Sequence, residues 1–396
     1  MYAPFRWRPC IVQDVAFLPF ARPDITEAEI SAVVETMRSG WLTTGPNAAA
    51  FEQEFLEFLG ADAHAVAVNS ATAGLHLAFE AIGVRPGDEV LVPTWTFTST
   101  AEAVRYLGGD PVLVDVDPHS LCIDLEDAER KVTERTVAIA PVHFAGLGVP
   151  DGALTAFAQR HGLRVVEDAA HALPTLNEGT LIGAHGHDAT VYSFYATKTM
   201  TTGEGGMVVT PDADLAARMR TMRLHGINRD VFDRYSSKKP SWHYDVVAPG
   251  FKYNLTDTAA AMGRVQLGRS REMAARRAEI GARYDDAFAG LPVTLPAHAP
   301  EGSSHAWHLY VLRLTDDASI CRDTFIQRMA DHEVGTSVHF IPLHLQPYWR
   351  DTYQHAPEDF PVATAQFQRC VSLPIFSSMT DDDVEQVVGA VREILG

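Results

Sequence analysis

The sequence predicts an α/β fold, in which a large domain on a mostly parallel sheet precedes a smaller α+β domain. Between about residues 60 and 210, short apolar runs alternate with segments of helical period, a pattern typical of a parallel sheet with helices on both faces. The 396 residues, 46% of them hydrophobic, suffice for two packed domains. We expect the large domain over residues 17–256, and a long linking helix with the smaller domain over 257–396.

Two helices are expected before the sheet. Thr26 and Glu29 have the spacing of a capping box, so a helix should begin directly after Thr26. Pro46, phenylalanines at every third or fourth position and a closing Gly60 predict an amphipathic helix with ordinary ends.

Seven apolar runs are expected to form the strands of the large sheet: 63–68, 89–93, 111–117, 137–142, 163–168, 189–194 and 206–210. Apolar residues at helical spacing between the first two runs predict a helix over 72–83. Ligands of such sheets bind beyond the carboxyl ends of the strands, so the residues just after these runs are the first candidates for a site.

The second half of the chain begins with a long loop. Residues 224–256 are rich in Gly, Pro, Ser and aromatic residues and have no clear period, and long loops are often functional. A helix is expected over 257–290, a strand over 308–314, and helices over 322–332 and 380–394.

The composition excludes several classes of protein. With 32 basic and 51 acidic residues the formal charge is −19, which repels polyanions, so we expect no nucleic-acid or membrane partner and a phosphate held only locally. Cys10, Cys122, Cys321 and Cys370 are far apart and form no CxxC motif, which favours reduced thiols. The first twenty residues contain no long apolar stretch, and we expect a cytoplasmic protein.

Two strand ends carry the strongest chemical signal. Asp168 and His171 follow the run 163–168, and Ser193 and Lys198 follow the run 189–194. Pyridoxal phosphate (PLP) requires a lysine that bonds its aldehyde and an acid that keeps its ring nitrogen protonated. The spacing alone is equally compatible with a structural ion pair or a surface lysine.

Two further segments could hold parts of such a cofactor. Small and hydroxyl residues at 69–74 precede a helix, where free N–H groups receive phosphate, although ordinary helix caps use the same residues. Trp95 or Phe97 could stack on a flat ring, although aromatic residues beside strands are more often core.

The histidine pairs do not predict a metal site. His305 and His308, and likewise His339 and His344, lack a third ligand at a spacing that zinc sites use. They either line a ligand pocket or are structural. The sequence GEGG at 203–206 precedes a strand instead of following one, so it is not a dinucleotide fingerprint.

Several long motifs together resemble a known family. The chain from about residue 17 onward is similar to the DegT-type nucleotide-sugar aminotransferases, which are PLP enzymes of fold type I with a seven-stranded large-domain sheet. The motifs are SGWLTTGP (39–46), NSATAGLHLA (69–78), PGDEVLVPTWTFTSTA (86–101), PVHFAG (141–146), EDAAHA (167–172), SFYATKTMTTGEGGM (193–207), PGFKYNLTD (249–257) and SLPIF (372–376).

The resemblance implies a role for each matching residue. Lys198 becomes the lysine that bonds PLP, and Asp168 the partner of its ring nitrogen. The other implied contacts are His171 near the ring hydroxyl, Phe97 (less well Trp95) stacked on the ring, Thr72, Ala73 and Ser193 at the phosphate, and Asn254 reaching the phosphate of the neighbouring subunit in a homodimer with shared active sites. One departure, Leu173-Pro174-Thr175 where many relatives carry a Gly-containing stretch, affects the local backbone only.

The resemblance also implies the reaction. L-glutamate would donate its amino group in a ping-pong cycle through pyridoxamine phosphate to a nucleoside-diphosphate 4-keto-6-deoxyhexose, in amino-sugar biosynthesis for an antibiotic or a surface glycan. Arg223, His225 and Arg229 are candidates for the donor carboxylates, unless they belong to a solvated loop, and His308 and His339 for the sugar.

The GEGG sequence and the extended segment 229–252 favour amination at C4 of the sugar. Amination at C3, and a non-catalytic PLP- or sugar-sensing regulator on the same fold, are the alternatives. A sugar 3-dehydratase is disfavoured because those relatives carry histidine in place of Lys198.

Overall fold

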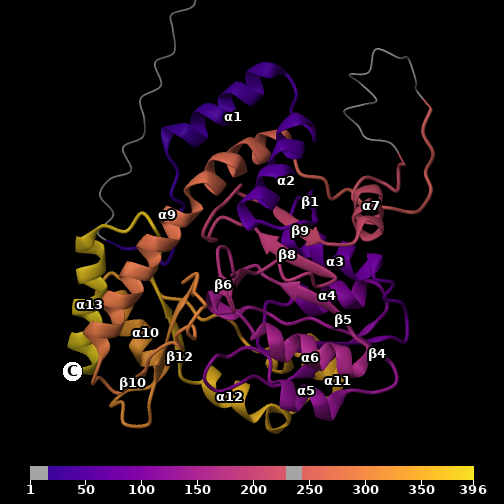
Figure 1. Cartoon of the computed structure of the whole chain (residues 1–396). Coiled ribbons are helices and arrows are strands. Elements are labelled where there is room, and N and C mark those ends of the chain that lie inside the picture. The colour runs from indigo at the N-terminus through magenta and orange to yellow at the C-terminus, as the bar shows by residue number, and fades with distance from the viewer. Residues whose placement is uncertain (1–16, 229–242) are drawn as a thin grey trace, which may run out of the picture.

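A computed structural model describes residues 17–228 and 243–396. Its centre is a seven-stranded sheet of order β1-β9-β8-β5-β4-β2-β3, in which every strand except β9 runs in the same direction (Figure 1). The strands are β1 (His64–Val68), β2 (Glu89–Pro93), β3 (Asp110–Val114), β4 (Thr136–Ile139), β5 (Arg164–Asp168), β8 (Ala189–Ser193) and β9 (Gly206–Thr210). The predicted α/β class and its mostly parallel sheet are therefore confirmed.

The predicted strands all occur, but two of them end early. The run 111–117 leaves the sheet after Val114, because Val116 turns away to bridge Ile123. The run 137–142 ends as a strand at Ile139, and Val142 makes only an isolated bridge to Asp168. Apolar residues continue past both ends, so hydrophobicity alone could not locate them.

Alternating residues of the central strands pack on opposite faces of the sheet. Val66 and Val68 of β1 belong to the core formed with α3 (Ala71–Ala81), whereas Ala65 and Ala67 face the core formed with α2 (Pro46–Leu59). The remaining helices of this half are α1 (Glu27–Ser39), α4 (Ser99–Tyr106), α5 (Leu125–Lys131), α6 (Asp151–His161) and α7 (Ala213–Met222).

The helix ends predicted from caps lie where expected. The capping box of Thr26 and Glu29 is formed at the start of α1, and α2 carries Pro46 in its first turn and Gly60 in the left-handed conformation at its end. The helix expected over 257–290 is α9 (Asp257–Phe288), which begins directly after the Thr256 cap.

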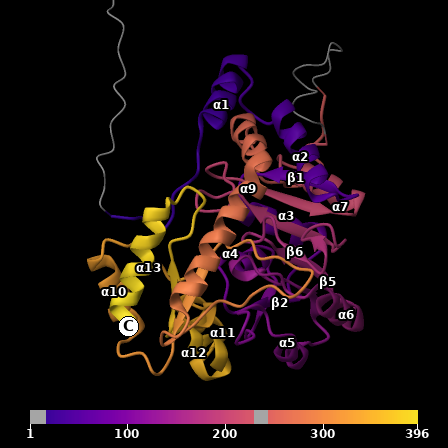
Figure 2. The same cartoon turned by 60° about the vertical axis from the view of Figure 1, so that its left-hand side comes forward.

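The long helix α9 connects the two halves of the molecule. Figures 1 and 2 show it running from the neighbourhood of α1 and α2 to α13 (Asp381–Leu395). Leu267 packs in the core beside α2, whereas Ile280, Tyr284 and Phe288 pack in the C-terminal core. We propose that the boundary between the two domains lies at the start of α9.

The C-terminal core covers a small antiparallel sheet of order β10-β11-β12. Its elements are β10 (Val293–Thr294), β11 (Tyr310–Leu314), α10 (Arg322–Asp331) and β12 (Cys370–Leu373), whereas α11 (Pro347–Tyr353) and α12 (Pro361–Phe367) pack through Trp349 and Ala363 on the core of the large sheet. A two-stranded ribbon, β6 (Leu176–Asn177) with β7 (Thr180–Leu181), follows the segment Leu173-Pro174-Thr175, whose Leu173–Pro174 peptide is cis. No helix within the described ranges is long and apolar enough to cross a membrane.

The start of β9 lies against the N-terminus of α3 with no room for a side chain. A Cβ atom on Gly206 would lie 2.9 Å from the Ala71 nitrogen and 2.8 Å from the Tyr192 carbonyl oxygen, and both are backbone atoms that cannot rotate away. This close approach fixes α3 relative to β8 and β9.

Gly206→Ala is therefore expected to lower the free energy of unfolding by about 1–3 kcal/mol, because the added methyl group overpacks rigid backbone. Denaturant unfolding of the cofactor-free protein measures this change. The control is Gly389→Ala in α13, where nothing lies within 4 Å of the new atom and a gain of about 0.5–1 kcal/mol is expected. Equal stability of the two variants would contradict the packing account.

Candidate active site

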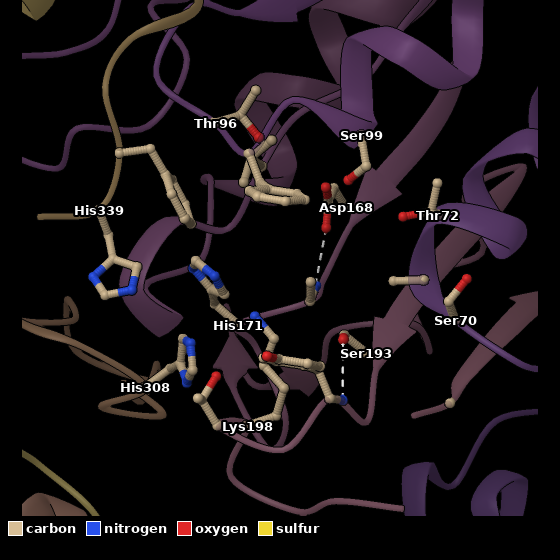
Figure 3. Close-up of a pocket in the computed structure, with 18 of the residues that line it drawn as sticks. Ser70, Thr72, Thr96, Ser99, Asp168, His171, Ser193, Lys198, His308 and His339 are labelled. Atoms are coloured by element: carbon tan, nitrogen blue, oxygen red, sulfur yellow. Dashed lines mark hydrogen bonds between the residues drawn. The ribbon is translucent and has the colours of Figure 1, made fainter. Parts of the chain in front are cut away.

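A cavity of about 510 Å³ lies beyond the carboxyl ends of the central strands. Residues after β2, β5 and β8, the start of α3 and two segments of the C-terminal half line it. Figure 3 shows three histidines on one side and Ser70 and Thr72 on the other, with Asp168 and Lys198 between them. The structure thus brings together the two strand ends singled out in the sequence.

Asp168, the last residue of β5, is buried and oriented by two donors. The Thr100 hydroxyl donates to Oδ2 at 2.7 Å and the Ala170 N–H donates to Oδ1 at 3.1 Å. Thr96 in turn lies 3.0 Å from the Thr100 hydroxyl, which fixes that group. A carboxylate accepts more than two hydrogen bonds, so Asp168 can still accept one from a ligand in the cavity.

Lys198 lies in the turn after β8, where its backbone N–H donates to the Tyr195 carbonyl. Burial lowers the pKa of its amine from the usual 10.5 to about 8, against the opposing attraction of Asp168. A lysine with this pKa has a substantial neutral fraction near pH 8, which both a nucleophile and a general base require.

One end of the cavity is suited to a phosphate. Ser70, Ala71 and Thr72 lie at the N-terminus of α3, whose first N–H groups have no acceptor within the helix, and Ser193 lines the same end. Ala73 does not line the cavity, and its N–H donates to the Ser70 hydroxyl at 3.1 Å. Of the predicted pair, Thr72 therefore lines this end of the cavity, together with Ser70 and Ala71.

The structure separates the two aromatic candidates. Phe97 lines the cavity, is 54% exposed and lies with its ring 5.7 Å from that of Phe340. Trp95 is fully buried, and its indole N–H donates to the His339 carbonyl at 2.8 Å. Phe97 is thus placed to cover a ring in the cavity, and Trp95 supports the wall behind it.

Three histidines form a neutral wall of the cavity. Burial, reinforced by the charge of Lys198, holds the pKa of His171 and of His308 well below the ordinary value and lowers that of His339 to about 4. The Ala145 N–H donates to Nδ1 of His171, which leaves Nε2 as its donor nitrogen. Nδ1 of His308 is buried without a hydrogen-bond partner in the described structure, so this side of the cavity offers a polar atom to a ligand.

Other predicted residues lie elsewhere. Asn254 does not line the cavity of its own chain and bonds the side chains of Thr44 and Lys252. Arg223 cannot hold a donor carboxylate, because it is buried in an ion pair with Glu52. His225 is exposed at the surface, while Arg229 lies outside the described residues.

The remaining two histidines of the predicted pairs serve the fold. His344 is buried between the hydroxyl groups of Thr94 and Thr364, and His305 accepts the Trp307 N–H. Sequence reasoning missed Thr100 and Phe340, which enter the site only through contacts with Asp168 and Phe97. Thr100 lies within the motif 86–101, but nothing in that motif indicates its contact with Asp168, and no motif includes Phe340.

The groups present fit PLP. A lysine amine of lowered pKa and an oriented carboxylate face one cavity, free helix N–H groups and hydroxyls lie at one end, and Phe97 lies beside it. The buried, unpartnered Nδ1 of His308 adds a polar contact for the ligand's other side. The fold and the cavity together define a PLP-dependent transaminase of fold type I.

The chain belongs to the DegT/DnrJ/EryC1/StrS aminotransferase family, whose sequence profile matches residues 23–392. The spore coat polysaccharide biosynthesis protein SpsC of Bacillus subtilis is 47% identical over 381 residues, which cover 96% of this chain and 97% of that protein.

Solved structures agree with this assignment. The pyridoxamine phosphate form of Spr1654, a putative sugar aminotransferase from Streptococcus pneumoniae, matches with a TM-score of 0.88 at 32% identity, covering 96% of this chain and 97% of that one. Helicobacter pylori PseC, an aminotransferase involved in the biosynthesis of pseudoaminic acid, matches with a TM-score of 0.87 at 25% identity, covering 96% and 99%. The chain is a PLP-dependent sugar aminotransferase of the kind that serves glycan or antibiotic biosynthesis.

The lowered pKa of Lys198 gives a direct test of the site. In the cofactor-free protein, acetylation of Lys198 as a function of pH should have its midpoint at about 8, because only the neutral amine reacts. Mass spectrometry of the peptide gives the modified fraction, with Lys131, which lies outside the cavity and is ion-paired to Asp127, as internal control. A midpoint near 10.5 would mean that the cavity does not perturb the amine.

Proposed function

We propose that the enzyme transfers the amino group of L-glutamate to C4 of a nucleoside-diphosphate 4-keto-6-deoxyhexose by a ping-pong mechanism in the cytoplasm. The observation that carries the proposal is the shared cavity of Asp168 and Lys198, in which an oriented carboxylate and an amine of lowered pKa face one ligand. The dispersed cysteines, of which Cys122, Cys321 and Cys370 are unpaired in the structure, favour a reducing compartment.

Lys198 has two tasks in this proposal. Its amine would hold the cofactor aldehyde, and when free the same amine would accept the proton of the donor's α-carbon and return it to the cofactor carbon that bore the aldehyde. When bound, PLP supplies a ring that accepts the electron pair released with that proton. Asp168 holds a proton on the ring nitrogen, and Thr100 keeps its carboxylate in position.

The neutral histidines suit a sugar better than a second anion. His308 and His339 offer hydrogen bonds without adding charge, which matches hydroxyl and keto groups. Glutamate as donor is supported by the family resemblance, and its distal carboxylate needs a cation that the described cavity residues do not supply besides Lys198. Arg229, the candidate that the sequence offers for this task, lies outside the described residues.

A homodimer with shared sites is part of the proposal. Asn254 lies at the end of a segment that pairs with β1, as its bridge to Val68 shows, and contacts no part of the cavity in its own chain. Its amide is bonded to Thr44 and Lys252, which holds the side chain ready for a phosphate on the partner subunit.

Loss of Lys198 should abolish turnover. Wild-type protein with PLP should be yellow, and L-glutamate should convert its visible band to that of the pyridoxamine form. Lys198→Ala should bind PLP without a covalent bond, show no such conversion and lose at least about a thousandfold in activity. Lys131→Ala, outside the cavity, is the matched control. Retained turnover in Lys198→Ala, or a colourless wild-type protein, would refute the assignment.

The regiochemistry is tested with a panel of nucleotide 4-keto and 3-keto sugars. Enzyme, L-glutamate and each sugar are incubated together, and NMR assigns the carbon that bears the new amine. We expect an amine at C4 of a 6-deoxyhexose. An amine at C3 would establish the alternative branch, and a protein that binds PLP and sugar without forming any amine would establish the regulator.

A further inference from the structure

Arg277, in the middle of α9, is a buried cation with no ion-pair partner among the described residues; the attraction of Asp24, which is itself paired with Arg269, acts on it from beyond ion-pair distance. Its side chain is 3% exposed, and the described residues place no carboxylate within the 4.0 Å of an ion pair. Its Nη1 donates instead to three backbone carbonyls: Ile375 at 2.6 Å, Trp307 at 3.2 Å and His308 at 3.4 Å. Nε is buried and has no partner in the described structure.

Stability alone does not explain such an arrangement. Burying a guanidinium without a carboxylate carries a large desolvation penalty that backbone carbonyls compensate only in part. Burial accordingly lowers the pKa of Arg277 to about 10, so the group is still charged at neutral pH. A neutral amide could bond carbonyls at lower cost, so the retained charge calls for another explanation.

The carbonyl contacts place this charge directly behind the cavity. Arg277 grips the backbone of His308, whose ring lies 4.3 Å from that of His171 in the cavity wall. Lys198 faces the same wall, and the charge of Arg277 lowers the pKa of the Lys198 amine in addition to burial.

The other groups around Lys198 do not replace this effect. Asp168 acts in the opposite direction, the histidines of the wall are neutral, and Tyr195 and the exposed Glu204 at the mouth carry no positive charge. Among the described residues facing Lys198, Arg277 is therefore the permanent cation that counters Asp168.

We propose that Arg277 is a positioning residue of the active site, whose carbonyl-bound charge behind the cavity favours the neutral form of the free Lys198 amine and whose hydrogen bond to the His308 backbone fixes that residue in the cavity wall. The inference rests on the proposed role of Lys198 as a general base. It adds a residue of the linking helix, which does not line the cavity, to the machinery that prepares the amine.

The test separates the charge from the grip. Arg277→Gln and Arg277→Met remove the charge. Arg277→Lys keeps a basic group but loses the forked guanidinium. The control is Arg276→Gln, because Arg276 is adjacent in sequence and pairs with Glu279 and Asp381 at the surface. Two neutral variants are used so that one folded protein suffices. All are full-length, and acetylation of Lys198 against pH is measured without cofactor.

The neutral variants should raise the labelling midpoint of Lys198 by about half a pKa unit or more, whereas Arg276→Gln should leave it unchanged. Arg277→Lys should increase modification of His308 by diethyl pyrocarbonate several-fold, because the grip on its backbone is weakened. In the PLP-loaded protein, the pH at which the visible band changes should shift in the same direction as the labelling midpoint.

An unchanged midpoint in a folded neutral variant, or an equal shift in Arg276→Gln, would overturn the electrostatic role. Unchanged His308 reactivity in Arg277→Lys would overturn the grip. Because the labelling needs no cofactor, these outcomes are distinct from a failure of the proposed function, which the wild-type response to PLP and glutamate decides.

Discussion

The parallel pairing of β5 with β8 is the constraint on which the site depends. Asp168 lies opposite Val191 in this register, so both strands end at the same edge of the sheet and the turn after β8 carries Lys198 to the acid. A slip of one residue would turn Asp168 to the other face, where its neighbour Glu167 is bound by His143 and Thr190. Sheet register thus decides which carboxylate faces the cavity and which one serves the core.

Electrostatics then separate the roles of the two groups. The overall charge of −19 does not hinder the binding of phosphates, because the structure offers them a helix N-terminus and hydroxyls instead of a basic surface. Inside the cavity, burial keeps the histidines neutral and lowers the pKa of Lys198, while hydrogen bonds from Thr100 and Ala170 hold Asp168. Burial therefore prepares the amine, and hydrogen bonds orient the acid.

The strands, the first helices and the two central site residues could be predicted from the sequence, because local sequence patterns indicate them. Short apolar runs marked the seven strands, capping residues marked α1 and α2, and strand ends marked Asp168 and Lys198. Contacts between distant residues could not be predicted. Thr100 reaches Asp168 from 68 residues away, and the ion pair that removes Arg223 from the site joins it to Glu52, 171 residues away. The sequence could not distinguish Trp95 from Phe97, because they lie two residues apart and only tertiary packing buries the first and places the second at the cavity.

The central claim is that Lys198 is the residue that holds the cofactor opposite Asp168. Its most direct test is borohydride reduction of the PLP-loaded protein, followed by proteolysis and mass spectrometry of the lysine peptides. The account predicts one stable pyridoxyl group per chain, on Lys198, and its loss when L-glutamate is added before reduction. A pyridoxyl group on another lysine, or on none, would contradict it.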